Sequence, residues 1–168
     1  MTQAKDLKLP VLAAYDVPPD GRYALHAHIA LVRVFALMED EIARLLSGHD
    51  LTMAHFEILL NLSDAAGLTQ QELAERMLVT KANVCITLDK MEKLGLAERR
   101  PDPTDRRINR IHPTPKGRAL LAKVRPIHAR YIEKVMSALE PSEQKTLYRS
   151  LTRLEFAIKA NQEDPATR

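Results

Sequence analysis

The spacing of apolar residues along the chain predicts a mainly α-helical protein. From Tyr23 to about Leu46, apolar side chains fall on nearly every face of the expected helix. A helix that is apolar all round has to be covered on all sides, and a chain of 168 residues has few other elements with which to cover it. We therefore expect a partner subunit to pack against this helix. The alternative is a central helix in a monomeric bundle.

Three shorter helices are predicted next. The first covers residues 53–62. Thr69 and Glu72 have the spacing of a capping box, which predicts a second helix that runs to about residue 77. A third helix is expected over residues 80–94, with a threonine as its N-cap and a glycine directly after its end. Because only a short turn separates the second helix from the third, the pattern is typical of a helix-turn-helix.

Alternating residues after the third helix predict a two-stranded β-hairpin. The segments 96–100 and 107–112 have the alternation of short strands. Between them, residues 101–106 have the chemistry of a turn. The hairpin directly follows the helix-turn-helix, which is the position of the wing in a winged helix.

Two long helices are expected after the hairpin. Thr114 is a good N-cap and Pro115 suits the first helical position, so a helix is predicted from there to about residue 139. A last helix is predicted to begin at Pro141. Its apolar stripe consists of Leu147, Leu151, Leu154 and Ile158.

A helical wheel of residues 80–94 separates an apolar face from a polar one. The apolar face holds Val84, Thr87, Leu88 and Met91, and the opposite face holds Ala82, Asn83, Ile86, Asp89, Lys90 and Lys93. One α-helix fits the major groove of DNA, where an asparagine amide can pair with a base edge and lysines can reach phosphates. The residues expected to contact DNA on this helix are Thr80, Lys81, Asn83, Ile86 and Lys90. An ordinary amphipathic helix with a solvated face is the alternative.

The charge pattern favours a polyanionic partner such as double-stranded DNA. The net charge of +3 is uneven, with five Lys and Arg against nine Asp and Glu in residues 1–68, and eleven against seven in residues 69–118. Positive surface of this kind attracts duplex DNA. Asp89 does not help DNA binding, and we expect it to pair with Lys93 on the same helix. Much of the basic charge lies on the hairpin, in Arg99, Arg100, Arg106, Arg107 and Arg110.

Composition disfavours several other classes of protein. The single cysteine, Cys85, cannot form an intramolecular disulfide, which favours a reducing, cytoplasmic location. No apolar run approaches the roughly 20 residues of a membrane span, and the first residues lack the apolar core of a secretory signal. No G-x-S-x-G, H-E-x-x-H or glycine-rich phosphate loop is present, so we expect neither an enzyme nor a cofactor. His26 and His28 do not share a helix face, so no metal site is expected.

The sequence resembles the MarR family of winged-helix transcriptional regulators over about residues 22–160. The resemblance lies in L-T-x-x-x-F-x-I-L-L-x-L (51–62), L-T-Q-Q-E-L-A-E-R-M (68–77), K-M-E-K-L-G-L-A-E-R-R-P-D-P-T-D-R-R (90–107) and H-P-T-P-K-G-R-A-L (112–120). Its most specific part is D-x-x-D-R-R followed by T-x-K-G. It implies a homodimer that binds a pseudo-palindromic DNA site, more often as a repressor than as an activator. It also implies that a small, often aromatic or phenolic, ligand or an oxidant releases the DNA.

The resemblance also implies roles for single residues. Arg106 corresponds to a wing-tip arginine that enters the minor groove, and Asp105 and Arg107 to charges that shape the tip. Two residues depart from the family pattern: Ile86 replaces a polar or basic residue and suits a thymine methyl, and Pro113 replaces an aliphatic one. A ligand pocket is implied between the dimer helices and the winged helix, and its candidate residues are Arg22, Tyr23, His26, Arg33 and His55.

Together these features predict a mainly α fold, a winged helix-turn-helix with a two-stranded β-wing and a helical dimerisation region from both ends of the chain. Two other functions remain open: a winged-helix module for protein–protein interaction, and a thiol-responsive regulator that senses through Cys85. The expected organisation is an N-terminal arm (1–20), a dimerisation region (21–50 and 114–161), a DNA-binding domain (51–113) and a polar tail (162–168).

Overall fold

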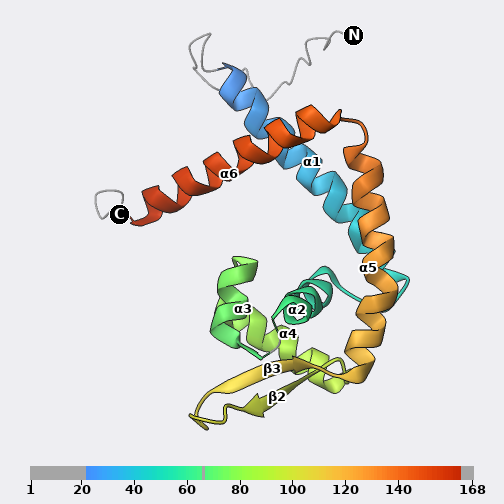
Figure 1. Ribbon diagram of the computed structural model, residues 1–168, viewed down its shortest axis with the longest axis vertical. Helices are drawn as coiled ribbons and strands as arrows, with labels where there is room; N and C mark the ends of the chain where they lie inside the picture. The colour runs from blue at the N-terminus through green and yellow to red at the C-terminus, as the bar shows by residue number, and fades with distance from the viewer. Residues whose placement is uncertain (1–21, 66, 164–168) are drawn as a thin grey trace. The chain divides into compact units, whose positions relative to one another are not determined.

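The computed structural model describes residues 22–65 and 67–163, which form six helices and three short strands (Figure 1). The expected arm at residues 1–20 and most of the expected tail at 162–168 lie outside the described residues. The chain divides into two compact units, Met1–Met53 and Ala54–Arg168. Mainly helical architecture with a small sheet confirms the predicted fold class.

The first unit contains α1 (Arg22–Ser47), which has nearly the predicted bounds. Near its C-terminal end, Ile42 and Leu46 are 7% and 1% exposed. The rest of the helix differs, because six large apolar residues there are exposed to solvent, whereas Leu25, Ile29 and Met38 are half-buried. These exposed residues are Tyr23, Leu31, Val32, Val34, Phe35 and Leu37.

The second unit is built around α2 (Met53–Asp64), α3 (Gln70–Met77) and α4 (Lys81–Lys93). The predicted capping box is present, because Thr69 Oγ1 accepts from the Glu72 N–H at 3.2 Å and Glu72 Oε2 accepts from the Thr69 N–H at 2.7 Å. Between α3 and α4, Leu78 has a left-handed backbone with φ of 53°. The core of this unit includes Phe56, Ile58, Leu59, Leu62, Leu73, Val84, Leu88, Met91 and Ile111, each at most 2% exposed.

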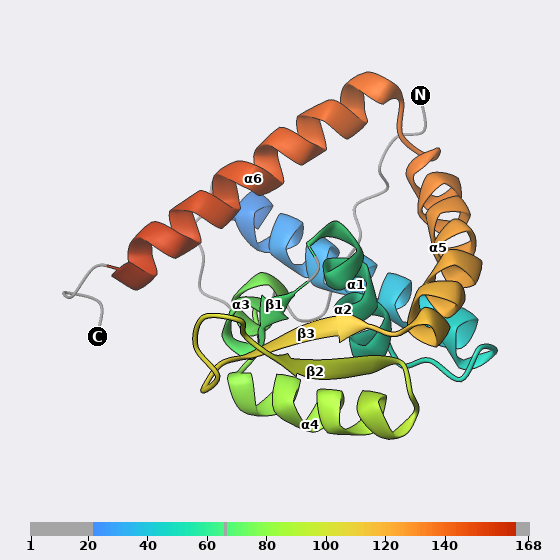
Figure 2. The same cartoon turned by 60° about the horizontal axis from the view of Figure 1, so that its bottom comes forward.

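A three-stranded antiparallel sheet, in the order β1-β3-β2, completes the winged helix. The strands β2 (Ala97–Pro101) and β3 (Asn109–Pro113) form the predicted hairpin, which lies along α4 (Figure 2). The strand β1 (Leu68–Thr69) was not predicted, because two residues cannot show an alternation. The predicted start of the second hairpin strand, residue 107, is two residues too early. The tip extends to Ile108, whose N–H donates to Asp105 O at 2.9 Å.

Two long helices follow, α5 (Pro115–Met136) and α6 (Pro141–Glu163). The helix α5 ends three residues before the predicted boundary, and Pro126 lies inside it. On α6, large apolar side chains are again exposed: Leu147, Tyr148, Leu151, Leu154, Phe156 and Ile158. Within the described part of the chain, no helix combines the length and apolar character needed to cross a membrane.

The T-P-K-G segment fixes the start of α5 to the end of α4. Thr114 Oγ1 accepts from the Gly117 N–H at 3.1 Å and donates to Gly95 O at 2.6 Å. Lys116 Nζ donates to Leu94 O at 2.8 Å, so a cation satisfies a carbonyl at the C-terminal end of α4. A Cβ on Gly117 would lie 2.1 Å from Leu96 O. Only glycine therefore allows this close approach of the two backbones.

We expect Gly117→Ala to lower the free energy of unfolding by about 1–3 kcal/mol, as overpacking of a close contact does. The atom in the way is a backbone oxygen, which cannot rotate aside as a flexible side chain would. Urea unfolding followed by circular dichroism at fixed protein concentration measures the effect. Gly48→Ala is the control, since its Cβ would meet Leu45 O at an ordinary 3.7 Å. If both variants were as stable as the parent protein, the close approach would be wrong.

Candidate nucleic-acid interface

One face of α4 anchors the helix and the other is open to solvent, as the helical wheel predicted. Val84, Leu88 and Met91 are at most 1% exposed. The helix begins at a proper N-cap, because Thr80 Oγ1 accepts from the Asn83 N–H at 3.2 Å. The exposed residues are those of the predicted outward face: Ala82, Asn83, Ile86, Asp89, Lys90 and Lys93. Lys81, in the first turn, is also exposed, so each candidate DNA contact of α4 is accessible to solvent.

A buried carboxylate organises the hairpin tip. Asp102 is 4% exposed, and its Oδ1 accepts from Thr104 N at 2.7 Å, Thr104 Oγ1 at 2.6 Å and Asp105 N at 3.1 Å. Its Oδ2 pairs with Arg110 Nε. The bonds from Thr104, followed by those from Arg110 and Asp105, hold the pKa of Asp102 well below its usual range. The charged carboxylate therefore fixes the turn at neutral pH.

A second ion pair shapes the outer end of the tip. Asp105 Oδ1 accepts from Arg107 Nε at 3.0 Å, and Oδ2 accepts from Arg107 Nη2 at 2.8 Å. The Arg107 N–H also donates to Oδ1, at 3.0 Å. These bonds to Arg107 lower the pKa of the Asp105 carboxyl. The two charges that the resemblance assigns to the shape of the tip thus pair with each other, although the Arg107 side chain remains 89% exposed.

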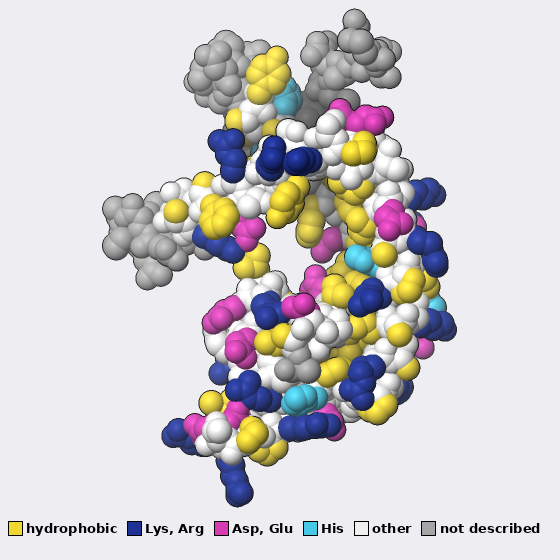
Figure 3. All heavy atoms as spheres, viewed as in Figure 1, with side chains coloured by type: hydrophobic (Ala, Val, Ile, Leu, Met, Phe, Trp, Pro, Cys, Tyr) yellow, Lys and Arg dark blue, Asp and Glu magenta, His cyan; other side chains and the backbone are white. Residues whose placement is uncertain are grey.

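The five arginines of the hairpin are not equally available to a DNA backbone. Arg99 pairs with two carboxylates of α4, and Arg100 pairs with Glu98. Arg110 bridges Asp102 and Gly67 O, the latter at 2.9 Å, and so ties the hairpin to the loop before α3. Arg107 is held by Asp105. Among the described residues, no carboxylate pairs with the exposed Arg106. Figure 3 shows basic side chains, in dark blue, around the hairpin end of the second unit.

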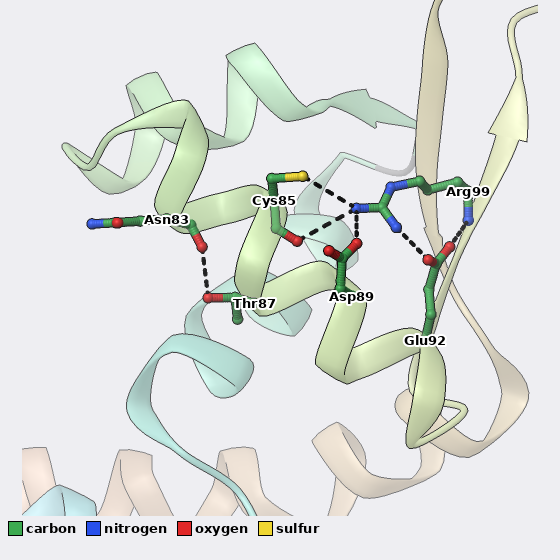
Figure 4. A network of polar contacts seen from close by, with 6 residues as sticks. All are labelled: Asn83, Cys85, Thr87, Asp89, Glu92 and Arg99. Carbon is green, nitrogen blue, oxygen red and sulfur yellow. Dashed lines mark hydrogen bonds and ion pairs between the residues drawn. The ribbon is translucent and has the colours of Figure 1, made fainter.

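The expected local pair between Asp89 and Lys93 is wrong. Asp89 Oδ1 instead accepts from Arg99 Nη2 of β2 at 2.8 Å (Figure 4). Arg99 Nη1 also pairs with Glu92, whose Oε1 accepts from the Arg99 N–H at 3.0 Å. Asp89 pairs with Arg99 on β2 in preference to Lys93 on its own helix, because the forked guanidinium of Arg99 can bind Asp89 and Glu92 at the same time. Sequence spacing alone gave no signal of this contact.

Cys85 lies at the edge of the same network, on the flank of α4 where the sequence placed it. Its side chain is half-buried, and Arg99 Nη2 lies 3.9 Å from its Sγ and 3.5 Å from its carbonyl oxygen. The thiol therefore lies beside a guanidinium and points away from Asn83 (Figure 4). A sensing role for this cysteine stays a prediction.

The expected ligand residues are divided between the two units. On α1, Tyr23 is 82% exposed, His26 is half-buried and Arg33 is exposed, whereas the side chain of Arg22 lies outside the described part. His55, on α2, is 6% exposed. Burial, and then the positive charge of Lys90, lower the pKa of His55, so it is neutral at physiological pH. The pocket between the units stays a prediction.

A depression of about 300 Å³ lies beside α4, and none of the expected ligand residues lines it. It is bordered by Ala54, Glu57, Met77, Val79, Asn83, Val84, Ile86 and Thr87. Because it includes the outward side chains of α4, it belongs to the candidate DNA surface. In residues 22–65 and 67–163, no group of three His, Cys, Asp or Glu side chains is placed to hold a metal ion.

Comparison with known proteins places these features in one family. Residues 49–108 match the model of the MarR family. The chain is 32% identical to a HTH-type transcriptional regulator of Bacillus subtilis (strain 168), YkoM, over 74% of this chain and 80% of that protein.

Two solved structures are similar over most of the chain. One is the transcriptional repressor CouR bound to a 23-mer DNA duplex, with 27% identity, a TM-score of 0.72 and coverage of 84% of this chain and 99% of that one. The other is a MarR family protein of Mycobacterium tuberculosis in complex with p-aminosalicylic acid. It has 28% identity, a TM-score of 0.60 and coverage of 76% of this chain and 97% of that one.

Proposed function

Because this chain belongs to the MarR family of transcriptional regulators, we propose that it is a homodimeric repressor that binds a pseudo-palindromic DNA operator and is released by a small aromatic or phenolic ligand. The observation that carries the proposal is the pairing of two exposed features in one winged helix. One is the outward face of α4, and the other is the hairpin tip with its exposed Arg106.

In this proposal α4 enters the major groove. Asn83 donates to and accepts from a base edge, Ile86 contacts a thymine methyl, and Lys81 and Lys90 reach phosphates. Thr80 lies at the N-terminal end of the helix, where the backbone N–H groups and the helix dipole favour a phosphate. The exposure of all five residues on α4 supports this arrangement.

The hairpin tip enters the neighbouring minor groove through Arg106. A flat guanidinium suits the narrow and strongly negative minor groove. Asp102 and the Asp105–Arg107 pair give the tip a fixed shape. The loop therefore does not have to become ordered each time Arg106 contacts DNA. Arg107 adds positive charge at the tip, although its partner Asp105 offsets much of it.

The dimer forms through α1 and α6, in a region that comprises residues 21–50 and 114–161. Large apolar side chains on both helices are exposed in the single chain, including Phe35 at 59% and Leu154 at 54%. Contiguous apolar surface of this kind marks an interface, and a two-fold dimer would present two copies of α4 to successive turns of the duplex.

Ligand release follows from linkage between two sites. A ligand that weakens DNA binding must bind the DNA-free protein more tightly than the DNA-bound one. We place the ligand near Arg22, Tyr23, His26, Arg33 and His55, where cations and a phenol could hold an aromatic acid. The complex of a family member with p-aminosalicylic acid supports this class of ligand.

We expect the protein to sediment as a dimer of 19.0 kDa chains at micromolar concentration. Leu154→Asp places a charge in the exposed apolar stripe of α6 and should shift the protein to the monomer. Lys159→Ala is the control, because it changes an exposed ion pair with Glu155 on the same helix and should leave the dimer intact. A monomeric parent protein would contradict both the dimer and the two-site mode of DNA binding.

Arg106→Ala should weaken binding by about 1–3 kcal/mol and reduce the salt dependence by about one unit, in both cases for each subunit of the dimer. The duplex is one that the protein itself selects from a random-sequence pool, and fluorescence anisotropy at several salt concentrations gives both quantities. Lys123→Ala, which removes an exposed charge on α5, is the control and should change neither. Undiminished affinity of Arg106→Ala would mean that the wing does not contact DNA.

Asn83→Ala serves as the matched test of the recognition helix. It should reduce the preference for the selected duplex over a scrambled one of the same composition, with nearly the same salt dependence, because it removes a base contact and no charge. Equal losses on the two duplexes would show that α4 does not read bases. If the parent protein selected no DNA at all, the protein–protein module would be the better account.

A panel of aromatic acids and phenols, beginning with p-aminosalicylate, should contain compounds that raise the melting temperature and weaken binding of the selected duplex. Both effects are required, since the ligand stabilises the DNA-free state. Aliphatic carboxylic acids of about the size of benzoate are the control, because they show whether any organic anion weakens DNA binding. If no aromatic compound changed either quantity, the ligand proposal would fail, and Cys85 would be the next candidate for sensing.

A further inference from the structure

Arg99 connects three elements of the winged helix through one side chain. It extends from β2, and its side chain is 19% exposed. Its guanidinium binds Asp89 and Glu92 of α4 and approaches the Cys85 carbonyl oxygen, at 3.5 Å from Nη2. The Gln70 side chain at the start of α3 lies beside the guanidinium, and with its amide oxygen assigned to the side that faces Arg99 it accepts from Nε at 2.9 Å and Nη2 at 3.1 Å.

We infer that Arg99 is a positioning residue for DNA recognition, which clamps the recognition helix to the wing through Asp89 and Glu92. The inference rests on the proposed DNA binding and adds a role to three residues that do not themselves contact the duplex. The clamp sets the angle between α4 and the hairpin, on which simultaneous contact with the major and minor grooves depends.

The geometry does not suit Arg99 as a phosphate contact. Its Nε, Nη1 and Nη2 groups all have acceptors within the protein, and the side chain is mostly buried. A phosphate would have to displace at least one carboxylate from the guanidinium. Burial lowers the pKa of Arg99, but the pairs with Asp89 and Glu92 outweigh this effect and raise the pKa above its usual value.

The contacts with Arg99 also account for two acidic residues, Asp89 and Glu92, on a helix that faces DNA in the proposed complex. The Asp89 side chain is 55% exposed and the Glu92 side chain 34%. An acid on a DNA-binding helix repels phosphates, so its removal should strengthen binding if repulsion were its main effect. If Asp89 instead holds the helix in place through Arg99, its removal should weaken recognition. The two roles therefore predict opposite signs.

Asp89→Asn decides between them. We expect this variant to bind the selected duplex about tenfold more weakly, in the range of a coupled charge pair, while it binds the scrambled duplex as tightly as the parent protein or more tightly. Arg99→Met should lose as much on the selected duplex, and the Asp89→Asn/Arg99→Met double variant should be no weaker than Arg99→Met alone. Arg99→Lys should recover only part of the loss, because an ammonium lacks the fork.

Glu98→Gln is the matched control. It removes an exposed acid from the same strand, where Glu98 pairs with Arg100 and not with α4, so neither duplex should be bound more weakly. Melting temperatures identify any variant that unfolds, and Asp89→Asn, which keeps the size of the side chain, carries the test if Arg99→Met does not fold. The inference is overturned if Asp89→Asn binds the selected duplex as tightly as the parent protein, or if the losses of the two single changes add. Failure of the parent protein to select any duplex would instead overturn the proposed function.

Discussion

The burial of one face of α4 is the constraint on which the rest of the winged helix depends. Val84, Leu88 and Met91 have almost no exposed surface, and α4 packs against α3 and β2. A fully buried aliphatic side chain contributes roughly 1.5–3 kcal/mol, so this face fixes the rotation of α4 about its own axis. The opposite face, with Asn83 and Ile86, is then directed outward.

Polar contacts fix the angle between α4 and the hairpin, which the burial of apolar side chains leaves free. Hydrophobic contact is not directional, so it does not set the angle between α4 and the hairpin. That angle is fixed at one end of α4 by Thr114 and Lys116, which bind the carbonyl oxygens of Gly95 and Leu94. Along the flank of the helix it is fixed by Arg99. In the proposed mode of binding to two grooves, rigid placement matters because a flexible wing would have to be ordered on each encounter.

The ion pairs of the hairpin also limit how much positive charge the wing offers to DNA. The sequence shows five arginines there, but four of them are bound to carboxylates of the same unit. Their task is to hold the turn and the strands, as Arg110 does for Asp102 and Gly67. A count of basic residues therefore overstates the electrostatic attraction of this hairpin for DNA. Arg106, one of five arginines, carries more of the proposed contact than one fifth of the positive charge would suggest.

The sequence by itself determined the helix bounds to within a few residues, the hairpin, the faces of α4 and the family. These features depend on local signals: caps at Thr69, Thr80 and Thr114, and the period of apolar residues. Only the tertiary structure decided that β1 adds a third strand and that Asp89 pairs with Arg99 rather than with Lys93. The reason is physical, since a local pattern specifies which side of an element is buried. The partner of a charge depends on which distant segments the fold brings within hydrogen-bonding distance.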